Sequence, residues 1–417
     1  MGSLDAAAPN LPAVAGQHIG KPRPIRVIVI GAGISDIAFA YKAQFLEKVE
    51  YVVYEKNGDV GGTWLESRYP GCSCDIPAHS YSYPWVGNPE WSKVYVGAEE
   101  IWDFYRQQTR EYGVYEHARF HHRDTATGVV SEDRADVVLN CAGVLKRWKW
   151  PDIAGLHLFA GTLAHTGNYP PGLDLAGKRV AVIGAGSSAI QVVPKFDVGC
   201  NRVTPGEGYL EALQEANVEL VRDGIAEVTA AGVVTARGKT YEADVIIAAT
   251  GYDTSYVPAF AVTGRAGAYF TCAVPDIPNY FMVVGPNTPI SNGSLMPSIE
   301  AQVDFALAFV DKIQGQNVKS VVVSRAAGTE FNDYKDAVME LLAFSGNCNS
   351  WYKGGTATGR IVGSWPGSVN HFLESVRSPR FEDFEFTYHS ENRFAYLGNS
   401  LTLRDIMKED LGCYIRA

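Results

Sequence analysis

Two segments of this chain share one pattern, a short run of β-branched residues that leads directly into a glycine-rich turn. IRVIVI at 25–30 precedes GAGISD, and RVAVI at 179–183 precedes GAGSSA. Each pattern is typical of a buried parallel strand, a tight turn and the start of a helix, the unit that holds a dinucleotide pyrophosphate. The sequence therefore predicts an α/β fold with two Rossmann-like dinucleotide-binding domains, of which the second is shortened.

Further apolar runs indicate the rest of these domains. DVVLNCAG at 136–143 and DVIIAATG at 244–251 are expected to be strands that close the two nucleotide-binding sheets. A strand and a turn are expected at 278–287. The residues from Pro297 onward predict an amphipathic helix, whose apolar face is formed by Ile299, Val303, Ala306, Val310 and Ile313.

The first glycine turn carries the stronger dinucleotide signal. Gly31 permits a tight turn, and Gly33 lets backbone N–H groups approach a pyrophosphate at the start of the helix, where Ser35 also lies. Glu55, 22 residues beyond Gly33, is placed to bind a pair of ribose hydroxyls. The third glycine position of the motif is occupied by Asp36, which adds bulk and charge and predicts weaker cofactor affinity.

Composition excludes several classes of protein. The net charge of −10 argues against a nucleic-acid partner, because a phosphate backbone requires a basic face. The seven cysteines include no CxxC pair, and the spacing of Cys72 and Cys74 does not suit a zinc site, so free thiols and no metal are expected. The first twenty residues lack the basic start and apolar core of a signal peptide, and no stretch predicts membrane insertion. These features favour a cytoplasmic protein.

The segment EKNGDVGGTWLESRYPGCSCDIPAHSYSY at 55–83 makes the function more specific. It resembles the flavin-binding stretch of the Baeyer–Villiger monooxygenases, which are class B flavoprotein monooxygenases. The resemblance extends from Pro24 to Asn399 and implies FAD and NADPH as cofactors. It places further FAD-binding residues at Thr63, Trp64, Leu65, Glu66, Asp75, Ile76 and Tyr81. It places NADP-binding residues at Ser73, Cys74, Gly184, Ala185, Gly186, Ser187, Ser188, Ala189 and Ile190.

A second motif resembles the family's fingerprint in the linker between the two nucleotide-binding domains. Its spacing matches, with tyrosine in place of the family's tryptophan, at Phe159, Gly161, His165, Tyr169 and Pro170. We expect His165 to hold the linker through hydrogen bonds to the backbone and not to act as an acid or base.

Relative to the family, the chain looks abridged in three places. Only 13 positions separate Ala189 from Arg202, where the family has a strand with an arginine for the NADPH 2′-phosphate. Residues 123–135 and 262–273 also look contracted. The chain is either a naturally reduced member or the product of an incomplete gene prediction or trimming.

The resemblance implies a reaction in which NADPH reduces FAD, O2 is activated, and one oxygen atom enters beside a ketone carbonyl to give an ester or lactone. The segment GCNRVTPGEGYLEAL at 199–213 makes Arg202 the candidate catalytic cation beside the flavin, oriented by Asp75. The alternative is that Arg202 is an ordinary surface arginine. The residues SWYKGG and SWPGS, at 350–355 and 364–368, either wall the ketone pocket or serve packing.

The sequence resembles those of fungal monooxygenases of secondary metabolism. This resemblance implies a polyketide or terpenoid ketone as substrate. Two alternatives remain: a flavin monooxygenase that oxidises nitrogen or sulfur, and a flavin-binding pseudoenzyme that has lost productive use of NADPH. The expected domains are a tail at 1–23, a first FAD-binding part at 24–155, an NADPH-binding part at 156–250, and a second FAD-binding part with the substrate region at 251–417.

Overall fold

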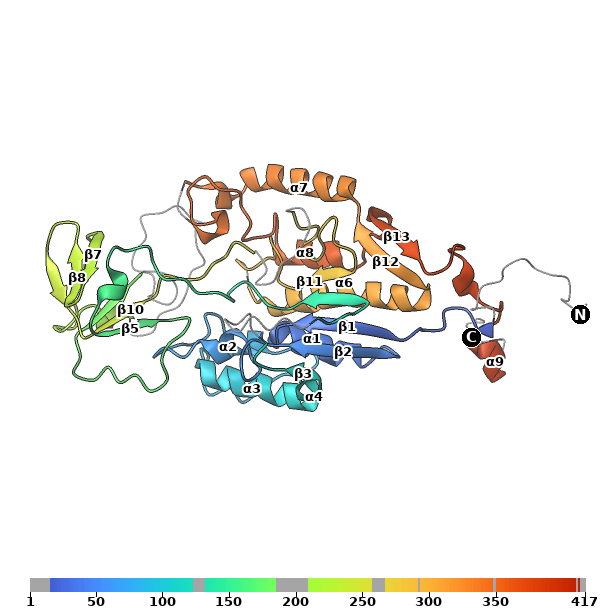
Figure 1. Ribbon diagram of the computed structural model, residues 1–417, viewed down its shortest axis with the longest axis horizontal. Coiled ribbons are helices and arrows are strands. Elements are labelled where there is room, and N and C mark those ends of the chain that lie inside the picture. The colour runs from blue at the N-terminus through green and yellow to red at the C-terminus, as the bar shows by residue number, and fades with distance from the viewer. Residues whose placement is uncertain are drawn as a thin grey trace, which may run out of the picture.

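The computed structural model describes residues 16–122, 132–184, 209–256, 267–291, 293–347, 350–409 and 412. Two groups of strands are arranged along its long axis (Figure 1). The larger group, with most of the helices, contains the first glycine turn, and the smaller group at the other end contains the second.

The larger sheet has five parallel strands in the order β11-β4-β1-β2-β3. Its strands are β1 (Ile25–Ile30), β2 (Val49–Tyr54), β3 (Ala118–Arg119), β4 (Val137–Asn140) and β11 (Tyr280–Met282). β4 is the predicted strand at 136–143, but it does not close the sheet, since it pairs with β1 on one side and β11 on the other. The sheet order depends on long-range pairing, which a local apolar run does not encode.

Two long helices bury their apolar faces next to this sheet. α1 (Ile34–Ala43) follows the first turn, and α6 (Met296–Gly315) packs against it. The face predicted for α6 is buried as expected, with Ile299, Val303, Ala306, Val310 and Ile313 at most 3% exposed. In Figure 1, α3 (Ala98–Glu111) and α4 (Val114–His117) lie below β1 and β2, and α7 (Arg325–Glu340) lies above them.

The smaller group contains a three-stranded parallel sheet and an antiparallel one. The parallel sheet has the order β5-β10-β6, and the antiparallel sheet has the order β7-β8-β9. The parallel strands are β5 (Thr162–His165), β6 (Val180–Ile183) and β10 (Val245–Ala248). The antiparallel strands are β7 (Ile225–Thr229), β8 (Gly232–Thr235) and β9 (Thr240–Glu242). β10, predicted to close its sheet, is the central strand.

The C-terminal part adds helices and a two-stranded sheet of β12 (Val318–Val323) and β13 (Phe384–Tyr388). Besides α6 and α7, this part contains α8 (Val369–Val376) and α9 (Leu403–Met407). Two short helices lie earlier in the chain, α2 (Thr63–Glu66) and α5 (Tyr209–Ala212). The short 3₁₀ turns are at Ala78–Tyr81, Leu156–Leu158, Ala343–Ser345, Trp351–Lys353, Phe381–Asp383 and Ala395–Leu397. In the part of the chain that the structure describes, no helix is long and apolar enough to cross a bilayer.

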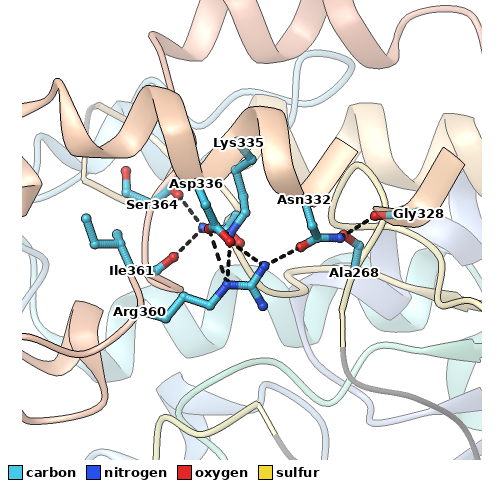
Figure 2. Close-up of polar contacts among 9 residues, drawn as sticks. Ala268, Gly328, Asn332, Lys335, Asp336, Arg360, Ile361 and Ser364 are labelled. Atoms are coloured by element: carbon cyan, nitrogen blue, oxygen red, sulfur yellow. Dashed lines mark hydrogen bonds and ion pairs between the residues drawn. The ribbon is translucent and has the colours of Figure 1, made fainter. Parts of the chain in front are cut away.

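Two polar contacts fix the outer parts of the molecule. Residues near the two ends of the described chain meet. The Asn399 N–H donates to the Gln17 carbonyl at 2.8 Å, and the Ile19 N–H donates to the Leu401 carbonyl at 2.9 Å. On α7, the Asp336 carboxylate lies between Lys335 and Arg360, and Arg360 also donates to Asn332 (Figure 2). The second contact ties the loop around residue 360 to α7.

Candidate active site

The turn after β1 brings the backbone to the end of the parallel strands. Gly31 adopts a φ of +98°, and a Cβ there would lie 2.9 Å from the Cys141 carbonyl oxygen, so only glycine fits. Its N–H donates to the Tyr54 carbonyl at 2.8 Å. Gly33 is the N-cap of α1, and Ser35 is buried in the first turn of that helix. The first N–H groups of α1 therefore face the end of the sheet, where an anion is favoured.

Glu55 fixes this turn from the end of β2. Its side chain is buried, and its two carboxylate oxygens accept hydrogen bonds from the Ala32 N–H at 2.7 Å and the Asn57 N–H at 2.8 Å. Burial raises the pKa of Glu55, while these backbone hydrogen bonds act in the opposite direction. Glu55 thus lies where the sequence predicts a ribose-binding acid and also supports the glycine turn.

A second pair of glycines packs directly on the first turn. The Gly61 N–H donates to the Ala32 carbonyl at 2.9 Å, and a Cβ at Gly62 would lie 3.3 Å from Cα of Gly33. A Cβ at Gly61 would lie only 2.4 Å from Cδ1 of Trp102. Trp102, which sequence reasoning missed, comes from α3. The helical spacing of Ile101, Phe104 and Tyr105 is a signal that would have predicted this helix.

The segment at 55–83, which resembles a flavin-binding stretch (the flavin-like stretch), folds back on the two glycine turns. Trp64 and Tyr81 meet edge to face with ring centroids 5.2 Å apart, and the Tyr81 hydroxyl donates to Asp75 Oδ1 at 2.9 Å. Burial, followed by the charge of Asp75, raises the pKa of Tyr81, so this hydroxyl stays a donor. Of the other predicted residues here, Cys74 is buried, Leu65, Glu66 and Ile76 are half-buried, and Thr63 and Ser73 are exposed.

The segment before α6 contacts the same stretch. The Ser294 hydroxyl donates to the Ser80 carbonyl at 2.5 Å, and Tyr105 contacts the sulfur of Met296 at 3.6 Å. An open groove of about 620 Å³ lies between the two segments. It is lined by His79, Ser80, Ser82, Tyr83, Pro84, Gly87, Asn88, Pro89, Ser294, Met296 and Pro297. Its serines and glycine give no periodic sequence signal, so sequence reasoning missed it.

Asp36, at the third glycine position, is fully buried in the first turn of α1. Neither of its carboxyl oxygens has a hydrogen-bond partner among the described residues. Burial and then the nearby Glu55 raise the pKa of Asp36 well above its usual value. The core therefore accommodates the side chain of Asp36. The negative charge expected for it is disfavoured by burial and by the nearby Glu55.

The second glycine turn follows β6 in the same way. Gly184 adopts a φ of +122°, and a Cβ there would lie 2.4 Å from the Ala249 carbonyl oxygen at the end of β10. The predicted NADP-binding residues Ala185–Ile190 and the predicted catalytic Arg202 lie outside the described residues, as do most of the three regions expected to be contracted.

The fingerprint residues organise the start of the smaller sheet. Gly161 precedes β5, and a Cβ there would lie 2.5 Å from the Asp244 carbonyl oxygen. His165 ends β5, is 1% exposed, and accepts a hydrogen bond from the Gly167 N–H at Nδ1 over 3.0 Å. Trp148 from the linker stacks on its ring at 4.9 Å. Burial lowers the pKa of His165. Phe159 and Tyr169 are buried, and Pro170 is half-buried.

The tryptophan motifs near the C-terminus differ in burial. Trp365 is 2% exposed and packs among Phe372, Phe331 and Phe270, which is a packing role. Trp351 is half-buried and contacts the ring of the buried Tyr352. The sequence leaves open whether these residues line the ketone pocket or serve packing, and the burial of Trp365 favours packing.

Taken together, the ends of β1 and β2 form a backbone cradle that suits a dinucleotide. Gly31 turns the chain with a positive φ so that the N-terminus of α1 follows directly, and Glu55 lies beside this turn as an acceptor. Among the described residues, no three His, Cys, Asp or Glu side chains are grouped to hold a metal ion. The four cysteines that the structure describes are free thiols.

Comparison with known proteins points to one group. Residues 29–97 match the NAD(P)-binding Rossmann-like domain family. The chain is 32% identical to the FAD-binding monooxygenase tazF of Aspergillus terreus, over 94% of this chain and 95% of the relative. It is 25% identical to a Baeyer-Villiger monooxygenase of Streptomyces coelicolor, over 88% and 94%. Its fold matches that of cyclohexanone monooxygenase from Rhodococcus sp. Phi1 bound to NADP+, with a TM-score of 0.78 and 22% identity over 88% of this chain and 100% of that one.

The alignment with the Aspergillus relative extends over 533 positions, whereas this chain has 417 residues. The abridgement that the sequence predicts stays a prediction.

Proposed function

This chain belongs to the FAD-binding monooxygenases, the family of the Baeyer–Villiger enzymes, and on that premise we propose that it uses NADPH and O2 to insert one oxygen atom beside a ketone carbonyl. The product would be an ester or a lactone. The observation that carries the proposal is the packing of Gly61 and Gly62 on the Gly31–Gly33 turn, with Glu55 hydrogen-bonded to Ala32.

The residues of this cradle suit FAD. The N–H groups at the start of α1 would hold the pyrophosphate, and Glu55 would accept hydrogen bonds from ribose. Gly61 and Gly62 keep side chains away from the Gly33 backbone, so a flat or extended group has access to it. Trp64, Tyr81 and their neighbours in the segment 55–83 would lie against the isoalloxazine ring of FAD.

When bound, FAD supplies the redox chemistry and the activation of oxygen. The role of the protein is to position the ketone, to exclude water and to supply a fixed positive charge near the reacting atoms. We assign that charge to Arg202, whose guanidinium remains protonated at all working pH values. Asp75, whose position is fixed by the Tyr81 hydroxyl at 2.9 Å, would orient and balance it.

NADPH would bind at the second turn. Gly184, with the residues that follow it up to Ile190, would hold its pyrophosphate, and Ser73 and Cys74 would contact it from the flavin-like stretch. The His165 hydrogen bond to Gly167 and the stacking of Trp148 would keep the linker in one shape while NADPH binds.

Reduction and product analysis test this function. The purified protein is loaded with FAD, mixed with NADPH without oxygen, and followed at the flavin absorption band; rapid bleaching is expected. With oxygen and a panel of ketones, mass spectrometry should find products heavier by one oxygen atom. Arg202→Ala should abolish these products while leaving NADPH oxidation in place, whereas Arg222→Ala, a change at an exposed arginine, should affect neither.

The same experiment separates the alternatives. Oxides of amine or sulfide probes without any ester would favour a flavin monooxygenase that oxidises nitrogen or sulfur. Tight FAD binding without bleaching by NADPH would favour a flavin-binding pseudoenzyme, which is supported by the short stretch between Ala189 and Arg202 and by the acid at position 36. Ester formation by Arg202→Ala would refute the role of that arginine.

The substrate class that we propose is a polyketide or terpenoid ketone of fungal secondary metabolism. Its support is the similarity to a fungal monooxygenase over nearly the whole chain. A panel of aromatic polyketide and terpenoid ketones, compared with simple cyclic ketones, tests it by relative turnover.

A further inference from the structure

The third glycine position of the first turn contains an acid in an environment that does not suit a charge. Asp36 is 0% exposed, and neither carboxyl oxygen has a hydrogen-bond partner in the described part of the chain. Burying a polar group without a partner is unfavourable, and burying an unpaired charge is far more so. The position of Asp36 in the first turn of α1 favours an anion, but this effect is smaller than the cost of burial.

Within the part of the chain that the structure describes, the titratable groups near Asp36 provide no positive charge. They are Glu55 at the end of β2, Tyr51 within β2, Tyr83 from the flavin-like stretch and Cys141 after β4. Glu55 is acidic, and the hydroxyl of Tyr83 already donates to the Ile34 carbonyl at 2.6 Å. Burial, and after it the proximity of Glu55, raises the pKa of Asp36. Burial is also the largest cause of the raised pKa values of Tyr51, Tyr83 and Cys141, so none of these groups supplies a charge that could stabilise an ionised Asp36.

We propose that Asp36 is a proton-binding site of the flavin-binding domain, which folds with this residue as a neutral carboxylic acid. Ionisation would place an unpaired charge between α1 and the sheet, at the helix whose N-terminus forms the cofactor cradle. The inference rests on the proposed function only where it concerns FAD, because FAD is expected to bind the folded domain and not the unfolded chain.

The sign of the pH dependence follows from proton linkage. The unfolded chain releases the Asp36 proton near the ordinary pKa of an aspartic acid, about 3.9, while the folded chain retains it to higher pH. Between these two values the folded state binds more protons than the unfolded state, so the stability of the domain falls as pH rises. The unfolding equilibrium constant is expected to rise about tenfold per pH unit in that interval. FAD retention would fall with it.

The test compares the full-length wild type with Asp36→Asn, which keeps the shape but does not titrate, and with Asp36→Gly, which restores the motif. Urea unfolding is measured from pH 5 to pH 9 without added FAD, and FAD affinity is measured over the same range by flavin fluorescence. Asp311→Asn, a change at an exposed acid on α6, is the matched control.

The wild type and Asp311→Asn should lose stability with rising pH relative to both Asp36 variants, by about tenfold per pH unit in the unfolding constant. FAD should dissociate from them at alkaline pH and remain on Asp36→Gly. Parallel pH profiles for wild type and both Asp36 variants would overturn the inference. Absence of FAD binding at every pH would overturn the proposed function instead, while the urea profiles would still decide the role of Asp36.

Discussion

Gly61 and Gly62 lie against the turn at Gly33, and neither position has room for a side chain. Gly61 has a φ of +119° and the ring of Trp102 directly beside it, while Gly62 has a φ of +52° and the Gly33 backbone beside it. At this site backbone conformation and close packing act together. A methyl group at Gly61 would have to displace Trp102, whose Nε1 donates to the Val60 carbonyl at 2.7 Å.

Gly61→Ala and Gly71→Ala separate these two effects. Both positions have positive φ, but a Cβ at Gly71 would meet nothing within 4 Å. Gly71→Ala should cost about 1–2 kcal/mol of stability from backbone strain alone. Gly61→Ala should cost about 1–3 kcal/mol more from overpacking and should also lower FAD content. Urea unfolding and flavin absorbance of the purified variants measure both, and equal losses would show that contact with Trp102 contributes nothing.

At the scale of single elements, α7 is stabilised by the carboxylate of Asp336, which forms ion pairs with both Lys335 and Arg360. The Lys335 side chain is only 1% exposed, and its charged end is paired with Asp336 (Figure 2). Burial lowers the pKa of Lys335, and the proximity of Asp336 opposes that effect. Arg360 donates to Asp336 at 2.9 Å and to Asn332 at 2.8 Å, so one helix and one loop depend on this carboxylate.

Removal of the shared acid should therefore destabilise α7. Loss of one partner of a wholly buried ion pair costs about 3–5 kcal/mol, and we expect about 1–3 kcal/mol for Asp336→Ala because this carboxylate is partly exposed. Adding Lys335→Met should recover at least half of the loss, because no charge then remains buried. Asp333→Ala, at an exposed acid on the same helix, should change stability little. Urea unfolding of the wild type, Asp336→Ala, Lys335→Met, the double variant and Asp333→Ala decides it, and additive losses in the double variant would contradict the pairing.

The strands and helices that sequence predicts best are those with a strong local apolar pattern. β1, β4, β6, β10, β11 and α6 all lie where an apolar run or a helical repeat predicts them. The positions of β4 and β10 within their sheets were wrong, because the pairing partners β11 and β5 lie far away in the sequence. α3 was missed although its apolar residues recur at helical spacing.

The candidate FAD site could be predicted because its residues also form a local sequence pattern. Gly31, Gly33 and Glu55 belong to one short βαβ unit, whose geometry is set by local sequence. The contact of Trp102 with Gly61 and the groove beside Ser294 depend on packing between distant segments. The burial of Asp36 was equally hidden, since sequence indicates its position in the motif but not the absence of a polar partner.

At the scale of the whole molecule, the two nucleotide-binding groups are joined by the linker that leads into β5. Trp148 stacks on His165, and Trp150 meets the same ring edge to face at 5.6 Å. Because the Gly167 N–H donates to Nδ1, that nitrogen must be unprotonated. The histidine is therefore neutral when the linker has the observed shape.

Acid should loosen this linker. The pKa of His165 is lowered in the folded protein, so the unfolded chain takes up the proton first, and stability is lost as pH falls below about 6.5. Tryptic cleavage after Lys149 should accelerate between pH 7.5 and 5.5 relative to His165→Gln, which does not titrate. His157→Gln, at an exposed histidine of the same linker, should behave like the wild type. Identical cleavage ratios for both variants would rule out a role for His165.

The pairing of residues 17–19 with residues 399–401 has a practical consequence. The two ends of the described chain meet at the end of the molecule that lies far from the smaller group of strands (Figure 1). An affinity handle attached beside either of these two segments would therefore tether the protein to a surface with its glycine turns facing the solution. The same proximity would let a short flexible peptide join the two segments in a circularly permuted variant.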